Sequence, residues 1–322
     1  MAAKSPELWK IQTLTKLRYK FDALRVGIER NKAEGLVLFN LRRNIHRLEK
    51  GLCHPSPKAV FAEDYIVETV RAFGKGLAND ELDDNTLPWA SSVLSLYFDV
   101  VAETPTTGAA KRQFNQIKSS LTELQATDHV PYPSSQRPAL SASYEALLNL
   151  SVRRRSVRYF QEQPPAYELV QRAYEIAKYA PSACNRQSFQ FLFYNDKQIV
   201  DQLSAIPGGV TGYSLPGIIV VVGRYDGYFD IRDINAPIID ASLSIMSFLF
   251  AAETLGLGTV CINWPNLLDR EQRIRKLLDI KPYEFVIMMI GIGYPLDSGK
   301  IPYSGKRPKE GVLLYNERIK PS

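Results

Sequence analysis

The chain has 322 residues, of which 45% are hydrophobic and 23% are charged. These proportions are those of a folded soluble protein and exclude a chain that is disordered throughout. The length favours two domains. No apolar run is long enough to span a bilayer, so we expect no integral membrane segment.

The N-terminal residues lack the apolar core of a secretory signal. The three cysteines, Cys53, Cys184 and Cys261, are widely spaced and suit neither a disulfide framework nor a metal site. We therefore expect a cytoplasmic protein that holds no metal.

The net charge of +6 is concentrated at the N-terminus, where residues 1–50 hold twelve Lys or Arg and five Asp or Glu. Such a segment could meet nucleic acid, an anionic membrane surface or an acidic partner. Its basic side chains could equally form the solvated face of a helix. We favour the solvated helix and expect no nucleic acid partner.

Residues 1–126 show helical spacing and no strand alternation. Apolar residues recur at intervals of three or four from Leu8 to Phe21, which marks one face of a helix. Further helices are predicted over residues 36–52, 63–77, 87–103 and 109–126. We therefore predict a separate N-terminal all-helical domain or arm over residues 1–126.

Residues 127–143 contain three prolines and five serines or threonines, a composition typical of a linker. Helices and strands alternate after it, so residues 144–322 form the second predicted domain. Its helices are predicted over residues 144–152, 165–179, 237–256 and 269–278. Its strands are predicted over residues 189–194, 217–223 and 284–292, with one more short strand after the glycines of 255–258.

Residues 153–160 read RRRSVRYF, with four arginines in six positions. Alternate residues of an extended stretch share a face, so Arg154, Ser156 and Arg158 could address one anion. Guanidinium groups match phosphate oxygens, and a serine hydroxyl adds a neutral donor. The same run could also be solvated surface charge, and alone it does not decide between the two.

Two other stretches carry candidate ligand contacts. Residues 180–191, APSACNRQSFQF, form a polar loop whose amides suit the edge of a heteroaromatic ring, although a turn without a ligand gives the same pattern. Residues 255–266, LGLGTVCINWPN, place glycines after a helix and before a strand, the reverse of the dinucleotide fingerprint. We expect Asn263 and Trp264 to present backbone N–H groups at that strand's end.

In this order, RRSVRYF, APSACNRQSFQF and LGLGTVCINW resemble the FMN-dependent nitroreductase family over about residues 144–318. The resemblance implies an α+β, three-layer sandwich whose homodimer binds FMN in two clefts at the subunit interface. It also implies NAD(P)H as electron donor and hydride transfer through flavin N5 to a quinone, nitroaromatic or other conjugated acceptor. Because the flavin carries the electrons, no catalytic side chain is expected.

The resemblance also implies a role for individual residues. Arg154 and Ser156 match contacts to the FMN phosphate, and Arg158 matches a cation near the flavin N1–O2 edge. The polar loop matches one that reaches the flavin from the other subunit, and the strand end matches the backbone that donates to N5. The expected cofactor contacts are Arg154, Arg155, Ser156, Arg158, Pro181, Ser182, Asn185, Gln187, Ile262, Asn263, Trp264, Lys306 and Arg307.

The chain departs from the family pattern in several places. Ser188 and Phe189 replace a Pro-Trp pair, and Ser304 stands where the first of two C-terminal cations would fall. A polar pair expected near residues 207–216 has no counterpart. We expect three aromatic residues, Tyr225, Tyr228 and Phe229, to form a wall that faces the substrate. The same residues could instead serve the dimer interface.

The role of the helical half stays open at this stage. Residues 41–57 resemble the helical extension of nitroreductase-like proteins associated with polysaccharide biosynthesis. The extension could cover the flavin cleft, dock an anionic partner or enlarge the dimer interface, and we favour the last because large apolar faces on arms meet other protein.

Two other functions compete with the NAD(P)H-dependent oxidoreductase. One is a specialised flavin reaction such as reductive dehalogenation or oxygen-dependent flavin cleavage. The other is a flavin-free or flavin-locked homologue that acts as a binding or scaffold protein in polysaccharide biosynthesis.

Overall fold

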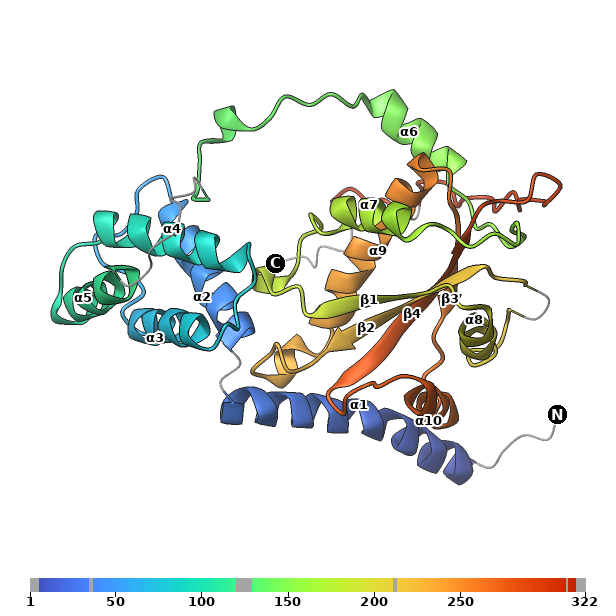
Figure 1. Ribbon diagram of the computed structural model, residues 1–322, viewed down its shortest axis with the longest axis horizontal. Coiled ribbons are helices and arrows are strands. Elements are labelled where there is room, and N and C mark those ends of the chain that lie inside the picture. Colours follow the sequence, from blue (N-terminus) through green and yellow to red (C-terminus); the bar gives the residue numbers. More distant parts are fainter. Residues whose placement is uncertain (1–5, 35–36, 120–128, 211–212, 311, 317–322) are drawn as a thin grey trace.

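The computed structural model describes residues 6–34, 37–119, 129–210, 213–310 and 312–316. Its first part is helical, as the sequence predicts, and Figure 1 shows the first helix apart from the others, which are grouped together. Residues 120–128, which include the end of the fifth predicted helix, lie outside the described residues. The five helices are α1 (Pro6–Glu34), α2 (Val37–Leu52), α3 (Ile66–Ala78), α4 (Thr86–Val100) and α5 (Pro105–Ser119).

The second part alternates helices and strands. Every strand and helix predicted there is present, and one additional helix, α8, was not predicted. The elements are α6 (Tyr144–Arg153), α7 (Tyr167–Ala177), β1 (Phe189–Tyr194), α8 (Lys197–Ser204), β2 (Gly217–Arg224), α9 (Ala236–Thr254), β3 (Gly258–Asn263), α10 (Leu268–Leu277) and β4 (Glu284–Gly293).

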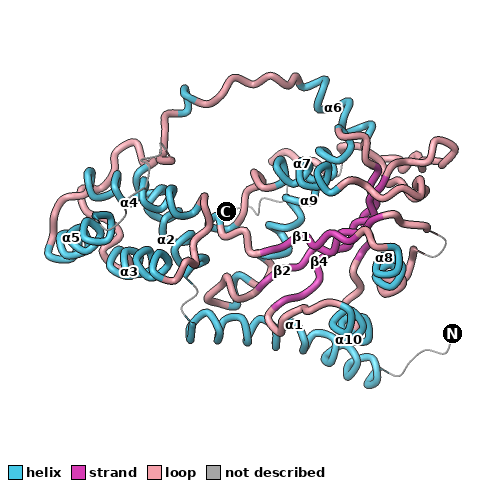
Figure 2. The backbone as a smooth tube through the Cα atoms, in the orientation of Figure 1, coloured by secondary structure: helices cyan, strands magenta, loops and turns pink. Residues whose placement is uncertain are grey.

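The four strands form one sheet in the order β1-β2-β4-β3, and every neighbouring pair is antiparallel. Figure 2 shows the sheet between two layers of helices, α7 and α9 on one face and α1, α8 and α10 on the other. Ile218 and Val220 of β2 point into one core, and Ile219 and Val221 point into the other. The strand reads as a continuous apolar run because both faces are covered. The predicted three-layer α+β sandwich is therefore confirmed.

Helix α9 is the longest apolar helix. The stretch Ile231–Thr254, which contains α9 and the short turn before it, is, among the described residues, the one long and apolar enough to cross a membrane by length and composition. The core helix of a soluble protein shares this property, and α9 packs Ala241, Ile245 and Phe248 against the sheet. The apolar side chains Ile239, Leu243 and Met246 stay exposed on α9.

The helical part contains two different packing arrangements. Helices α2 to α5 enclose a core of their own, which includes Ile45, Phe73 and Leu94. Helix α1 instead packs against the end of the sheet, where Ala23 and Leu24 contact Tyr225 and Phe285. Helix α1 therefore adds to the core of the α+β part, although it precedes the predicted domain boundary by about ninety residues of chain.

Phe21 lies outside that contact and is 48% exposed, so the apolar face of α1 is carried by Ala23 and Leu24 and not by Phe21. The structure does not describe the side chains between Leu8 and Leu17.

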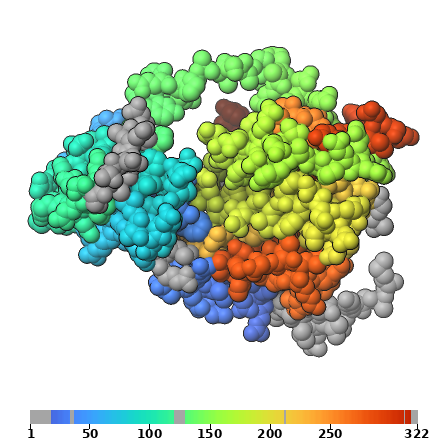
Figure 3. Space-filling model, in the orientation of Figure 1, coloured from blue at the N-terminus to red at the C-terminus, as the bar shows by residue number. Residues whose placement is uncertain are grey.

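Residues 129–143 connect the two parts as an exposed extended stretch with one short turn, and Figure 3 shows this stretch as a separate arch. Ser143 ends the stretch by capping α6, because its side chain accepts a hydrogen bond from the Ala146 N–H.

Candidate functional site

The arginine run lies along the outer edge of β3. Helix α6 ends at Arg153, and Ser156 then forms a parallel bridge with Thr259 of β3. The Val157 N–H donates to the Thr259 carbonyl at 2.9 Å. Because Val157 points into the core and is 6% exposed, the residues on either side of it are turned outward.

The arginines of this run differ in their partners. Arg153 Nε lies 2.9 Å from the carboxylate of Glu253. Arg155 Nη1 donates to the carbonyls of Ser151 and Arg154, and Arg158 Nη1 donates to the Ser156 carbonyl at 3.3 Å. Within the described part of the chain, no carboxylate pairs with Arg154, Arg155 or Arg158. Three positive charges are therefore left without an ionic partner at this edge.

Arg154 gives the clearest indication of a ligand. Its Nε is buried and has no hydrogen-bond partner among the residues that the structure describes. An unsatisfied buried donor costs about 1–3 kcal/mol, and more when the group is charged. The Arg154 guanidinium also lies close enough to Cys261 to oppose the burial that raises the pKa of that thiol. An anion on the outer edge of β3 would satisfy Arg154, so the residues present fit a phosphate group there.

The end of β3 offers backbone groups more than side chains. Ile262 and Trp264 are each 4% exposed and belong to the core beneath the sheet. Asn263 is exposed. Since β3 is the last strand of the sheet, no further strand in the described ranges covers its outer edge beyond Thr259. At residues 262 and 264, therefore, a ligand can meet the backbone groups but not the buried side chains.

The part of the polar loop that precedes β1, residues 181–187, is fixed from outside by two side chains. The Ala183 N–H donates to Oδ2 of Asp240, on α9, at 2.9 Å. Arg42, on α2, donates from Nε to the Asn185 carbonyl at 2.8 Å. Neither Asp240 nor Arg42 was predictable from the sequence, because both are distant from the loop in the chain.

Hydrogen bonds inside the loop orient its polar groups. Gln187 Nε2 donates to Oδ1 of Asn185 at 2.8 Å, and the Gln187 N–H donates to Oγ of Ser182 at 3.2 Å. Three residues have left-handed backbone, with φ of 54° at Cys184, 51° at Asn185 and 52° at Gln187. Non-glycine residues hold this conformation only when the surroundings enforce it. Pro181 is exposed at the start of the loop.

The two residues that depart from the family pattern after the loop both turn inward. Ser188 is fully buried and donates from Oγ to the Arg224 carbonyl at 2.9 Å. Phe189 is 8% exposed and belongs to the core between the sheet and α7 and α9. The Ser-Phe pair therefore stabilises the start of β1.

Within one chain the two groups of expected flavin contacts do not meet. The arginine run lies beside β3, whereas the polar loop leads directly into β1. These two strands form the opposite edges of the sheet. Lys306 and Arg307 lie in an exposed stretch, residues 301–310, after the sheet. Ser304 in this stretch has a φ of 50°.

The expected substrate wall needs correction. Tyr225 and Tyr228 have no exposed surface. Tyr225 stacks on Phe285 with ring centroids 4.5 Å apart, and the Tyr228 hydroxyl lies 3.4 Å from Asp240 Oδ2. Only Phe229 remains partly exposed, with the Arg43 guanidinium 4.7 Å from its ring centre. Neither tyrosine can therefore face a substrate, because both serve the core.

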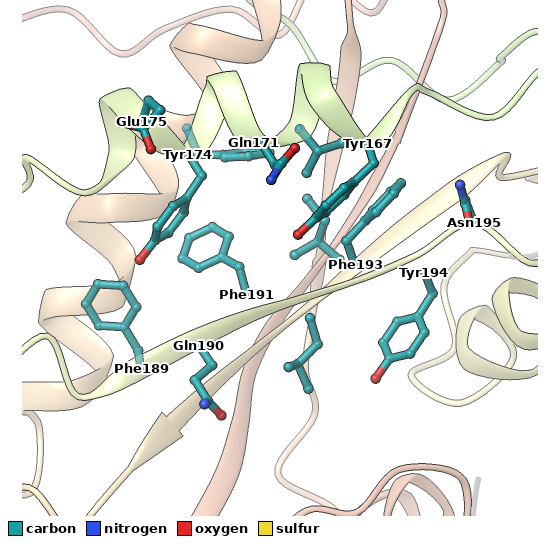
Figure 4. Close-up of a pocket in the computed structure, with 14 residues that line it drawn as sticks. Tyr167, Gln171, Tyr174, Glu175, Phe189, Gln190, Phe191, Phe193, Tyr194 and Asn195 are labelled. Atoms are coloured by element: carbon teal, nitrogen blue, oxygen red, sulfur yellow. The ribbon is translucent and has the colours of Figure 1, made fainter. Parts of the chain in front are cut away.

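A cavity of about 820 Å³ opens between α7 and the outer edge of β1 (Figure 4). Half of its lining residues are aromatic: Tyr167 stacks on Phe193, and Tyr174 packs its edge against Phe191. None of the expected flavin contacts lines it. Because the unpaired arginines lie at the opposite edge of the sheet, we place the candidate flavin site at the arginine run.

Comparison with known proteins shows which protein family the chain resembles. Residues 152–208 and 212–294 match the sequence model of the Nitroreductase family. Both the arginine run and the end of β3 lie in the matched region. The α+β part of the chain therefore resembles the nitroreductase family in sequence.

Individual relatives are distant. A protein of Archaeoglobus fulgidus assigned to the NADH dehydrogenase/NAD(P)H nitroreductases is 28% identical over 157 residues, 48% of this chain and 87% of the relative. The FMN reductase (NAD(P)H) of Bacillus subtilis is 27% identical over 175 residues, 49% of this chain and 68% of the relative. A solved FMN-dependent nitroreductase of Clostridium difficile is 22% identical, covers 52% of this chain and 98% of its own, and has a TM-score of 0.46.

Proposed function

We propose that this protein is an FMN-dependent oxidoreductase of the cytoplasm. It takes hydride from NAD(P)H and passes it through flavin N5 to a quinone, a nitroaromatic compound or another conjugated acceptor. One observation carries the proposal: within the described part of the chain, a buried guanidinium N–H of Arg154 has no acceptor, and Arg158 in the same run has no ionic partner. The match of residues 152–208 and 212–294 to the nitroreductase family, and the FMN reductase among the relatives, support the same cofactor.

The chain's own groups have distinct tasks in this proposal. Arg154, Ser156 and the C-terminal cations Lys306 and Arg307 bind the phosphate dianion through charge-assisted hydrogen bonds. Arg158 supplies a positive charge beside the ring, where a fixed cation stabilises the negative charge that develops on reduction. FMN, when bound, supplies the two-electron chemistry, so the side chains bind, orient and tune it.

The proposal includes a homodimer. The arginine run and the polar loop flank opposite edges of one sheet, so a flavin that meets both would have to lie between two chains. Two exposed apolar surfaces support such an interface. Helix α6 buries none of its residues and exposes Tyr144, Leu147 and Leu148. Helix α9 exposes Leu243 and Met246 on the side away from the sheet.

The visible absorbance of the purified protein tests the proposal, recorded without oxygen before and after addition of NADPH and of NADH. We expect a flavin band that bleaches on reduction and returns when a quinone is added. A colourless protein that stays colourless after incubation with FMN would contradict the oxidoreductase and favour a flavin-free binding protein. A yellow protein that neither nicotinamide bleaches would favour the flavin-locked alternative.

A further inference from the structure

The polar loop is held by a residue of the helical half. Arg42 lies on α2, only 9% exposed, at the contact between the helical bundle and the loop. It donates from Nε to the Asn185 carbonyl at 2.8 Å and from Nη1 to Thr86 Oγ1 at 2.6 Å. Its guanidinium also lies over the Trp89 ring, 5.2 Å from the centre. The side chain is therefore fixed on three sides.

The bundle also supplies the negative charge that a buried arginine needs. Thr86 donates from Oγ1 to Asp83 Oδ2 at 2.8 Å and from its backbone N–H to Oδ1 at 2.7 Å. Burial acts to raise the pKa of Asp83, but these hydrogen bonds and the charge of Arg42 hold it below its usual value. Arg42 is thus linked through Thr86 to an ionised carboxylate, which keeps its orientation fixed.

The loop has a conformation that needs such support. Its backbone is left-handed at Cys184, Asn185 and Gln187, and strained positions of this kind cost on the order of 1–3 kcal/mol each. Asp240 holds the loop at the Ala183 N–H. Arg42 holds it at the Asn185 carbonyl, between two of the strained residues. Without Arg42 this carbonyl would lose its charged donor, and the following turn would be free to relax.

We propose that Arg42 is a positioning residue of the cofactor site: the helical half holds the loop in the shape that presents Asn185 and Gln187 to FMN. This inference rests on the proposed function, since it assumes that the loop meets FMN. It gives the N-terminal half a task in the cofactor site, whereas the sequence favoured a larger dimer interface. The bundle contact is made within the same chain as the loop.

The test compares FMN affinity in full-length variants, measured by quenching of flavin fluorescence as apoprotein is titrated. Arg42→Ala should weaken binding about tenfold, the effect of losing one hydrogen bond from a charged donor. Arg42→Lys should recover part of the affinity, because lysine keeps the charge but cannot hold both acceptors. Arg47→Ala is the matched control: Arg47 lies on the same helix, over the Tyr65 ring, and donates to Asp64.

A second readout separates positioning from general stability. At saturating FMN, the visible circular dichroism of the bound flavin should differ between Arg42→Ala and wild type, because a relaxed loop changes the flavin environment. If Arg42→Ala does not fold, Thr86→Val replaces it. That change removes the hydroxyl that Arg42 contacts at almost constant side-chain volume, and it should weaken FMN binding a few-fold.

The outcomes distinguish the two proposals. A wild-type protein that takes up no FMN refutes the proposed function and the inference with it. A wild type that binds FMN, with Arg42→Ala or Thr86→Val equal to it in affinity and dichroism, overturns the inference alone. Equal losses in Arg42→Ala and Arg47→Ala would likewise overturn it, because the effect would then belong to the bundle as a whole.

Discussion

Arg224 and Asp226 form a two-point ion pair at the end of β2, with Nε to Oδ1 at 3.1 Å and Nη2 to Oδ2 at 2.7 Å. Asp226 has no exposed surface. Helix α1 closes over it: Asn31 donates from Nδ2 to the Asp226 carbonyl at 2.6 Å, and Arg30 Nη1 lies 3.5 Å from Oδ2. This cluster, together with the apolar contact beside it, attaches the N-terminal helix to the sheet.

Removing the carboxylate should therefore weaken the attachment of α1 to the sheet. Asp226→Asn leaves Arg224 with only the more distant Glu284, 3.7 Å away, as an ionic partner. We expect a loss of about 3 kcal/mol in the free energy of unfolding, measured by urea denaturation, because the buried side of a two-point ion pair loses its charge and Arg224 keeps a weaker partner. The exposed pair Lys197–Asp201 provides the control, and Asp201→Asn should change the free energy by less than about 1 kcal/mol. Equal effects would show that the Asp226 cluster is not a structural attachment.

Asp240 should make stability depend on pH. Burial raises the pKa of its carboxyl, although the Ala183 N–H, the Tyr228 hydroxyl and the Arg186 charge partly offset this. The folded protein then keeps the proton to higher pH than the unfolded chain does. The contribution of Asp240 to stability is thus greatest at low pH and falls as pH rises from about 3.8 through the folded pKa.

The measurement is the difference in unfolding free energy between wild type and Asp240→Asn across this range. Asparagine can still accept from Ala183 and does not titrate. The difference should fall with rising pH, by up to about 1.4 kcal/mol per pH unit inside the window, and then level off. A difference that rises with pH would show that hydrogen bonding outweighs burial at Asp240.

The turn between α9 and β3 supports the arginine run. A Cβ on Gly258 would lie 2.8 Å from Cβ of Val157, the buried residue between Ser156 and Arg158. Gly258→Ala should therefore displace the run, cost about 1–3 kcal/mol of stability and weaken FMN binding. Gly256→Ala is the control, because Gly256 has a φ of +77° and nothing within 4 Å of a Cβ. It should cost stability through its backbone alone and leave FMN affinity unchanged; weakened FMN binding in both variants would contradict the steric argument.

The proposed dimer places the exposed apolar side of α9 at the interface. Leu243→Asp should produce a monomer by light scattering and release FMN, because a charge at a buried apolar contact lacks a partner. Leu277→Asp, at another exposed leucine on α10, should leave both properties unchanged. A wild type that is monomeric yet retains FMN would contradict a site between two chains.

Local patterns were sufficient to predict most of the fold. The apolar runs of β2 and β4, and the proline at the start of α9, mark their elements without reference to the rest of the chain. Helix α8 was missed because it has only eight residues, although Asp196 in front of it accepts from the N–H groups of Gln198 and Ile199, as an N-cap does.

The functional site was only partly predictable from the sequence, because some of its contacts join residues that are distant in the chain. Arg154, Ser156 and Arg158 stand together in the chain, so their pattern is visible in the sequence. The burial of Tyr225 and Tyr228 depends on contacts with Phe285 and Asp240, which lie elsewhere in the chain. The sequence around the two tyrosines therefore predicts exposed aromatic side chains where the structure has buried ones. Contacts such as the one from Arg42 to the loop arise only once the chain has folded.

The most direct test of the central claim is FMN affinity in two neighbouring arginine variants, Arg154→Ala and Arg153→Ala. Arg153 is already paired with Glu253, whereas Arg154 has a buried donor without an acceptor. We expect Arg154→Ala to weaken FMN binding roughly 10- to 100-fold, the loss of charged hydrogen bonds to a phosphate, and Arg153→Ala to bind as wild type does. Wild-type affinity in Arg154→Ala, or equal losses in both variants, would contradict a phosphate site at Arg154.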